Sequence, residues 1–149
     1  MNKPKKLPYE DYRFIYDRVP RLCVDLVIRT GEGMVLSKRD IEPGKGLWHM
    51  PGGTVLMGES LADARQRIAG EETGLSLGGV QLLGTMEFVE EDNPYFHTVS
   101  LVFLAEVADG TLRGSDQGAE IRFFKELPGP MITEQERFLA ALTGLWSVP

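Results

Sequence analysis

Residues 51–75 read PGGTVLMGESLADARQRIAGEETGL, and this segment determines which fold we predict for the chain. The two glycines that follow Pro51 allow the backbone to turn tightly and to expose its carbonyl groups. Apolar residues then recur at helical spacing over about 60–72, and Gly74 supplies the helix stop. The segment therefore predicts a glycine turn that leads into an amphipathic helix.

Glu71 and Glu72 lie side by side at the end of the predicted helix. Adjacent carboxylates repel each other, and a hard cation beside them stabilises the pair. Arg67 can hold Glu71 in place from one helical turn away, and Glu59 precedes the helix as an anion near its first turn. The residue types alone leave two interpretations open, a Mg²⁺–phosphate site and a solvated helix end.

The spacing of these residues resembles the Nudix box, G-x5-E-x7-R-E-U-x-E-E-x-G-U, in which U is apolar. One box position departs, because Ile68 stands where the pattern has a glutamate. The preceding segment, KRDIEPGKGLWHM at 38–50, also resembles the sequence that precedes the box in this family. The resemblance covers at least residues 22–125. The matching positions are Gly53, Glu59, Arg67, Ala69, Glu71, Glu72, Gly74 and Leu75.

The resemblance implies an α/β fold, the Nudix α/β/α sandwich, and the periodicity along the chain also predicts a mixed sheet with helices on both faces. We expect a single domain over 1–149, with 1–20 as an N-terminal helical extension. Thr133 to Glu136 has the pattern of a capping box at the start of the last helix. The predicted strands cover 22–29, 34–38, 48–50, 80–90, 95–107 and 119–124, and the other helices cover 9–19 and 60–72.

The resemblance also implies a role for each charged residue of the box. Glu71 and Glu72 would ligate Mg²⁺, or Mn²⁺ in its place, with help from the backbone carbonyl of Gly52. Arg67 would orient a glutamate, and Glu59 would contact the metal-binding residues without binding the metal itself. The implied reaction is attack of water on a phosphorus atom of a nucleoside diphosphate that is linked to another group.

Ile68 changes two of these implications. Its apolar side chain takes the space of a third carboxylate, so a second metal ion is not expected on that side. The general base must then come from elsewhere in the chain. Glu120 and Asp116 rank first because they lie on the loop where other Nudix enzymes place a base, and Glu90 and Glu91 follow them.

Two further segments resemble GDP-mannose mannosyl hydrolases, a subgroup within this family. They are EDYRFIYDRVPRLCVDLVI at 10–28 and HTVSLVFLAEV at 97–107, and the second segment places His97 on a strand. In that subgroup a glutamine helps to bind the metal, and charged residues bind the substrate near the sugar. The residues that the resemblance assigns to these roles are Gln117 as a metal ligand and Arg39 and Asp25 as substrate-binding residues.

Other positions separate the chain from that subgroup. Gly118 stands where the subgroup has its histidine base, and Thr54 stands where it has an arginine. Glu71 is a carboxylate that the subgroup lacks. These differences favour P–O hydrolysis over cleavage at the sugar carbon. The glycosyl-cleaving reaction stays open as an alternative, and so does a weakly catalytic domain that binds a nucleotide as a sensor.

Trp48 and His97 each have two interpretations. Trp48 predicts a stacking contact with a nucleobase, or a place in the core, where aromatic residues of strands usually lie. His97 predicts a substrate contact, or a structural role within its strand. Trp48 and His97 are therefore candidate substrate-binding residues.

The charge of the chain limits its partners. A net charge of −6 and a pI of about 5.0 argue against duplex nucleic acid and leave a small phosphorylated molecule as the expected partner. No window approaches 18 consecutive apolar residues, so we expect no membrane span and a cytoplasmic protein. Tyr9, Tyr12, Tyr16 and Val19 form a largely aromatic stripe on the first helix, which we expect to pack in a homodimer.

Overall fold

The structure is a computed structural model, and it describes residues 5–115, 118 and 120–142. The helices are α1 (Tyr9–Tyr16), α2 (Leu61–Thr73) and α3 (Thr133–Ala140). The strands are β1 (Arg21–Thr30), β2 (Gly33–Lys38), β3 (Trp48–His49), β4 (Gly52–Thr54), β5 (Leu75–Phe88), β6 (Thr98–Gly110) and β7 (Glu120–Phe124).

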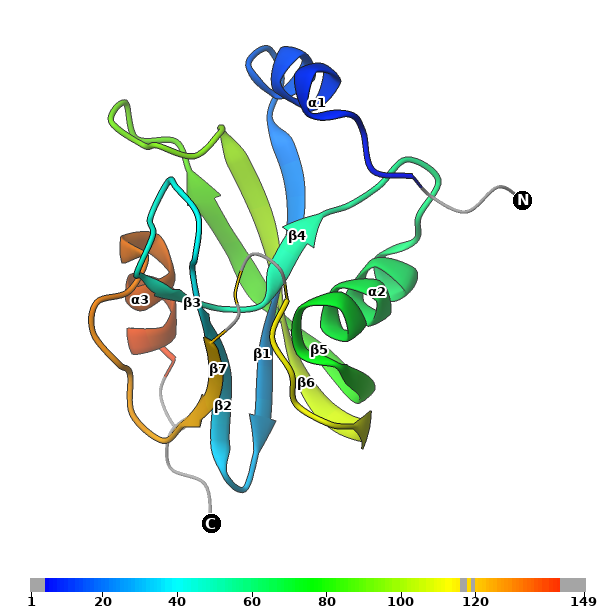
Figure 1. The fold of residues 1–149 in the computed structure, drawn as a ribbon, viewed down its shortest axis with the longest axis vertical. Coiled ribbons are helices and arrows are strands. Elements are labelled where there is room, and N and C mark those ends of the chain that lie inside the picture. Colours follow the sequence, from blue (N-terminus) through cyan, green and yellow to red (C-terminus); the bar gives the residue numbers. More distant parts are fainter. Residues whose placement is uncertain (1–4, 116–117, 119, 143–149) are drawn as a thin grey trace.

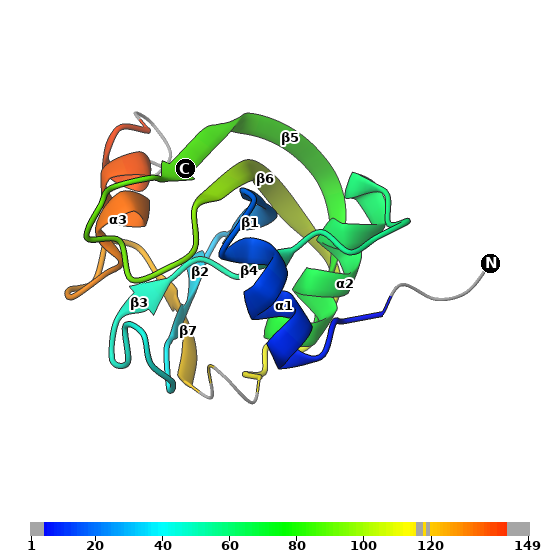
Figure 2. The same ribbon diagram turned by 90° about the horizontal axis from the view of Figure 1, so that it is seen from above.

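These strands form a mixed sheet that runs in the order β3-β2-β1-β6-β5, while β4 pairs with β1 and β7 pairs with β2. β1 and β6 are parallel, and the other pairs are antiparallel. α2 and α3 pack into separate buried clusters on opposite sides of the sheet (Figures 1 and 2). The α/β fold with helices on both faces is therefore confirmed. No helix within the described ranges is long and apolar enough to cross a membrane.

β1 lies in the middle of the sheet and is buried without interruption over residues 23–28. A strand that is covered on both faces needs apolar side chains on both sides, which explains its nearly continuous hydrophobic run. Val24, Leu26 and Ile28 join the cluster under α2, whereas Val27 joins the cluster under α3. The exception in this run is Asp25, a buried carboxylate.

α2 forms where the sequence predicts it because both of its ends are satisfied locally. The backbone N–H of Asp63 donates to the Ser60 hydroxyl at 3.1 Å, which caps the first turn. Gly74 ends the helix in the left-handed region, at φ 76°. A side chain at this position would also meet the backbone oxygen of Thr111 at 2.5 Å. The bounds of α2 therefore follow from the capping residues.

The glycine turn of the box forms β4, a strand that the sequence did not predict. Gly52 pairs with Asp25, so the beginning of the box is attached to the central strand of the sheet. Gly53 faces α2, where a Cβ would lie 3.4 Å from Cγ1 of Ile68. Ile68 itself is buried, and it fills the space between the turn and the helix. The turn is thus fixed from both sides.

Two predicted strand and helix boundaries are wrong. β5 begins at Leu75 rather than near residue 80, because Gly78 and Gly79 carry the strand through an irregular register with β6. α1 ends at Tyr16 rather than near 19, with Asp17 as its C-cap. The other predicted elements lie within a few residues of their expected places.

The predicted capping box of α3 is also wrong. The helix begins at Thr133 as expected, but the N-cap residue is Ile132 and no side chain makes a capping hydrogen bond. The backbone N–H of Glu136 donates instead to the carbonyl of Ile132 at 2.9 Å. The helix end is stabilised by packing, since Leu139 and Gln135 are buried, and the Gln135 side chain accepts from the N–H of Met50 at 2.6 Å.

Candidate active site

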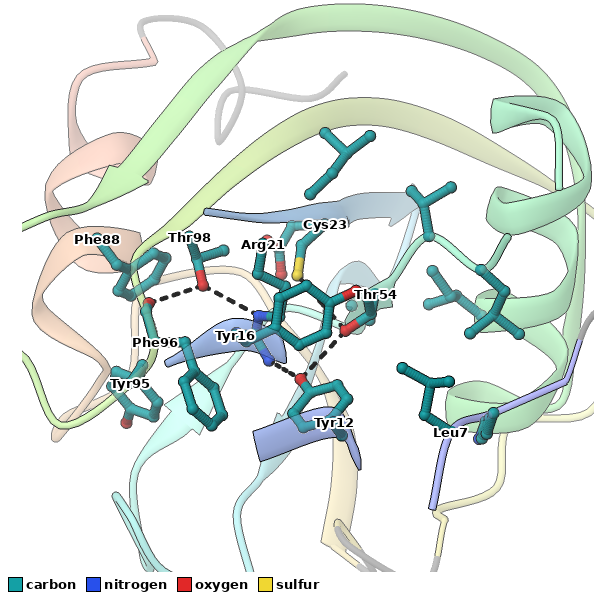
Figure 3. A pocket seen from close by; sticks show the side chains of 18 of the residues that line it. Leu7, Tyr12, Tyr16, Arg21, Cys23, Thr54, Phe88, Tyr95, Phe96 and Thr98 are labelled. Atoms are coloured by element: carbon teal, nitrogen blue, oxygen red, sulfur yellow. Dashed lines mark hydrogen bonds between the residues drawn. The ribbon is translucent and has the colours of Figure 1, made fainter. Parts of the chain in front are cut away.

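A cavity of about 1460 Å³ lies between α1, the glycine turn, the end of α2 and the loops at 39–43 and 93–97. Ligand pockets commonly have volumes of ~300–1,000 Å³, so this cavity has room for a ligand with several linked groups. Figure 3 shows the part of the cavity that lies beneath α1. The box contributes Gly52, Gly53, Arg67, Ile68, Glu71 and Glu72 to its wall.

Arg67 holds the two ends of the box together. Its guanidinium donates to both carboxylate oxygens of Glu59, at 2.6 and 3.0 Å, and to the backbone oxygen of Thr54 at 2.9 Å. The Glu59 side chain is only 2% exposed. These hydrogen bonds lower the pKa of Glu59, so the carboxylate stays ionised beside its partner. The loop before α2 is therefore tied to the helix by a buried ion pair.

Glu71 also belongs to this arrangement, at its more exposed edge. Arg67 reaches one Glu71 carboxylate oxygen through Nη1 at 3.2 Å. The ammonium group of Lys6 lies 3.0 Å from the same oxygen. One carboxylate thus lies between two cations, one from α2 and one from the N-terminal segment that leads to α1.

Glu72 is more buried than its neighbour. Burial raises the pKa of Glu72, and the negative charge of Glu71 adds to this effect. The hydroxyl of Ser115 donates to Glu72 at 3.4 Å and partly offsets the cost of burial. Two carboxylates that raise each other's energy in this way are stabilised by a cation between them.

The donor set at the end of α2 fits a magnesium ion. Mg²⁺ is usually bound by one or two carboxylates and completes its coordination with water and substrate phosphate. Glu71 and Glu72 are two carboxylates that could serve in this way, and they line the same cavity as Gly52. Within the described residues there is no group of three or more His, Cys, Asp or Glu side chains that could hold a metal ion. A closed site made only of protein ligands is therefore not present in this part of the chain.

Asp25 is a buried carboxylate directly beneath the glycine turn. A Cβ on Gly52 would lie 2.2 Å from Oδ1 of Asp25, so position 52 has no room for a side chain. Burial raises the pKa of Asp25 to about 6, against the effect of the hydrogen bond that Ser100 donates. Asp25 lines the cavity, as a substrate-binding residue must.

Arg39 enters the cavity from the loop after β2. Its Nε donates to the backbone oxygen of Pro43 at 2.7 Å, and its guanidinium lies 5.7 Å from the centre of the Tyr95 ring. A Cβ on Gly44 would collide with the Tyr95 hydroxyl at 2.3 Å, so the ring lies directly against this glycine. Tyr95 therefore brings the loop at 93–97 next to the loop that carries Arg39.

A second compartment of the cavity is aromatic and rich in hydroxyl groups. The Tyr12 ring makes edge-to-face contacts with Tyr16 and Phe96, with ring centres 4.8 and 5.5 Å apart, and the Tyr16 and Phe96 rings are tilted at 6.3 Å. Arg21 donates through Nη1 to the Tyr12 hydroxyl and through Nε to the Thr98 hydroxyl at 3.1 Å (Figure 3). Tyr12 in turn lies 3.2 Å from the hydroxyl of Thr54, the residue that follows the glycine turn.

The remaining predicted site residues have different outcomes. His97 lines the cavity and is exposed, but β6 begins one residue later, so its predicted place on the strand is wrong. Trp48 is 6% exposed and packs against Phe124 in the core, a placement that fits its core interpretation and not base stacking. Glu120 lies on β7, where it pairs with Lys38 at 3.8 Å, and it does not line the cavity. Asp116 and Gln117 lie outside the described residues.

Sequence reasoning missed three polar contacts of the site. Ser100 meets Asp25, Ser115 meets Glu72, and Lys6 meets Glu71, each across more than 40 positions of the chain. The parallel register of β1 and β6 could have located the first pair, since Asp25 lies opposite Val102 and close to Ser100. No local signal marks the other two contacts.

The chain is similar to several known proteins. The NUDIX domain family matches residues 19–142. The low-salt glycan biosynthesis protein Agl8 of Haloferax volcanii is 32% identical over 142 residues, which is 92% of this chain and 91% of that protein. The ADP-ribose pyrophosphatase of Methanocaldococcus jannaschii is 36% identical over 120 residues, which is 80% of this chain and 69% of that protein.

A solved structure shares the fold. The MutT NUDIX hydrolase from Burkholderia pseudomallei superposes with a TM-score of 0.76 and 28% identity, over 85% of this chain and 100% of that one. Proteins of this family act on small nucleoside diphosphate derivatives and generally use divalent metal ions. Because the family match spans most of the chain, the protein is a member of the Nudix hydrolase family.

Proposed function

We propose that the chain hydrolyses a nucleoside diphosphate linked to a sugar, by Mg²⁺-dependent attack of water on a phosphorus atom. The observation that carries this proposal is the pair of carboxylates at the end of α2, which faces one large cavity together with the glycine turn. Glu71 and Glu72 hold the metal, with the Gly52 carbonyl as a further donor. A Mg²⁺ ion held there would supply positive charge beside the diphosphate.

The chain's own residues fix this geometry. Arg67 is tied to Glu59 and Thr54, so it holds Glu71 in position from a rigid base. Arg39 supplies a guanidinium that can donate two parallel hydrogen bonds to a phosphate. Asp25 and His97 line the cavity as further substrate contacts. This arrangement orients the diphosphate. A separate residue must act as the general base that takes a proton from the attacking water.

We propose Asp116 and Glu120 as the candidate bases and Gln117 as an additional metal ligand. Asp116 directly follows Ser115, whose hydroxyl contacts Glu72, and this adjacency supports it over Glu120. Asp116→Asn and Glu120→Gln variants separate the two. The variant that lacks the base loses activity and also loses the acidic limb of the pH–rate profile, while the other keeps both.

The sugar is supported by two observations. The Agl8 relative is named for glycan biosynthesis, and ADP-ribose, named in the second relative, is itself a nucleoside diphosphate joined to a sugar. The compartment at Tyr12, Tyr16 and Arg21 also offers aromatic faces and hydrogen-bonding groups, which together suit a polyhydroxylated ring. Trp48 has no part in this proposal because it lies in the core.

A substrate panel tests the proposal. The purified chain is incubated with nucleoside triphosphates, dinucleotides and nucleotide sugars, with Mg²⁺ and with EDTA. We expect turnover of sugar-linked diphosphates that stops when the metal is removed. Turnover in EDTA, or turnover confined to triphosphates, contradicts the proposal. Tight nucleotide binding without any product supports the alternative, a nucleotide-binding sensor.

The site of bond cleavage needs a separate measurement. Glycosyl cleavage at the sugar carbon is the second candidate, because Thr98, Asp25 and Arg21 gather near the aromatic compartment as they would around a sugar. Hydrolysis in ¹⁸O-labelled water followed by mass spectrometry distinguishes the reactions. Label in the phosphate supports P–O hydrolysis, and label in the sugar supports the second candidate.

We also propose that α1 packs against a second copy of the chain. No residue of α1 is buried, and Tyr9, Phe14 and Ile15 are exposed large side chains on this helix. A homodimer would cover this surface. Light scattering at the mass of one chain, across micromolar concentrations, would contradict a dimer.

A further inference from the structure

Lys6 is a cation from outside the box that reaches the proposed metal ligands. It belongs to the segment before α1, and its ammonium group lies 3.0 Å from the carboxylate of Glu71. Lys6 and Leu7 line the same cavity as the box. The Lys6 side chain is 68% exposed, so few contacts restrain its long, flexible stem. Its ammonium can therefore change partners without disturbing the core.

The charges of the site explain why such a cation is needed. Ile68 replaces a third carboxylate with a buried apolar side chain, and the site loses a ligand for a second metal ion. One divalent cation is neutralised by Glu71 and Glu72, so it leaves the negative charge of a diphosphate uncompensated. The charge of Arg67 is already engaged by Glu59 through two hydrogen bonds. Arg21 is engaged by the hydroxyls of Tyr12 and Thr98, and Arg13 pairs with Asp17. Among the described residues, Arg39, Lys5 and Lys6 are the other cations that line the cavity.

We propose that Lys6 is a diphosphate-binding residue that supplies the positive charge a second metal ion would otherwise bring. It pairs with Glu71 while the metal is absent. When the metal binds Glu71, the Lys6 ammonium moves to an oxygen of the diphosphate, since a lysine is a mobile point charge for phosphate. This inference rests on the proposed function, because it takes Glu71 as a metal ligand.

Two effects of opposite sign follow from this exchange of partners. Without a diphosphate, Lys6 competes with the metal for Glu71, so its removal strengthens binding of the metal alone. With a diphosphate present, Lys6 attracts the ligand, so its removal weakens binding of the diphosphate to the metal-loaded protein. A surface lysine without a role in binding changes neither affinity.

The experiment compares Lys6→Gln with Lys125→Gln, which removes the same charge from an exposed position outside the cavity lining. Lys125 has no ion pair among the residues that the structure describes. Calorimetry measures the affinity for Mn²⁺ alone, and then for methylenediphosphonate, a non-hydrolysable diphosphate, in saturating Mn²⁺. In Lys6→Gln we expect Mn²⁺ to bind about two- to fivefold more tightly and methylenediphosphonate about tenfold more weakly. In Lys125→Gln both affinities should stay within about twofold.

Different results point to different errors. Unchanged affinities in Lys6→Gln, or equal changes in both lysine variants, overturn the role of Lys6 while leaving the metal site intact. Weaker binding of both Mn²⁺ and the diphosphonate in Lys6→Gln also overturns it, because the exchange of partners predicts opposite signs. If wild-type protein binds no Mn²⁺ at all, the proposed function itself fails.

Discussion

α1 and α2 border the same cavity, yet they are held in different ways. α2 is capped at both ends, buries Ala64, Ile68 and Ala69 against the sheet, and is tied to the preceding loop by a buried ion pair. α1 buries no residue and has no side-chain cap. Its links to the body include the hydroxyl group and ring of Tyr12 and the ring of Tyr16, which meets Phe96. One wall of the cavity is therefore fixed by burial and capping, and the other is attached through polar and aromatic contacts.

The largest expected effect comes from the rigid wall. Glu72→Gln keeps the size of the side chain and removes the charge that would bind the metal, so we expect kcat to fall by about 100-fold or more. Burial raises the pKa of Glu72, so the neutral variant should be folded at least as stably. Steady-state kinetics and thermal unfolding measure the two effects. Retained activity in this variant would refute the metal assignment.

Removing the anchor of α2 should reduce stability. Arg67→Ala leaves the buried Glu59 carboxylate with one remaining hydrogen bond, from the N–H of Leu56. We expect the free energy of unfolding to fall by about 2–3 kcal/mol, measured by urea denaturation. Arg13→Ala on α1 is the matched control, because its pair with Asp17 is exposed and should contribute less than about 0.5 kcal/mol. Equal losses in both variants would contradict the contrast between the two helices.

His49, which lines the cavity, should make the stability of the fold depend on pH. Burial lowers the pKa of His49 to about 4, from 6.5 in the unfolded chain, so the folded protein holds it neutral. The unfolded state therefore takes up a proton first, and this part of the stability is lost as the pH falls from 6.5 towards 4. From pH 7 to pH 5 the loss is about 2 kcal/mol.

The test compares thermal unfolding of the wild type and His49→Gln at both pH values. The variant should lose less stability on acidification, by the amount that His49 contributes. His97→Gln replaces the exposed histidine and should follow the wild type. If both variants respond to pH alike, the buried environment of His49 has no part in acid sensitivity.

The smallest expected effect lies in α1. Tyr12→Phe removes the hydroxyl that joins Arg21 to Thr54, and we expect the free energy of unfolding to fall by about 1 kcal/mol. Tyr9→Phe is the control, since Tyr9 is highly exposed and should change stability by less than about 0.5 kcal/mol. A loss above 3 kcal/mol in Tyr12→Phe would show that α1 is as firmly attached as α2.

The contrast between the helices also explains what could be predicted from sequence. The box residues act over one or two helical turns, so their spacing alone predicts α2 and the link from Arg67 to Glu71. The start of β5 and the cap of α3 depend on pairing and packing with distant segments, and those predictions were wrong. The contact of Ser115 with Glu72 joins a loop to α2, and that of Tyr95 with Gly44 joins two loops, and no periodicity reveals either.

The crowding at Gly52 limits how this protein could acquire new substrates. A side chain at position 52 would strike the buried Asp25 and the backbone oxygen of Val24, and Gly44 has a φ of 81°, which other residues rarely adopt. Both positions therefore favour glycine, whereas Ile41 and His97 are exposed and line the same cavity. Selection for a different leaving group would therefore accumulate changes in the two loops and keep the glycine turn constant.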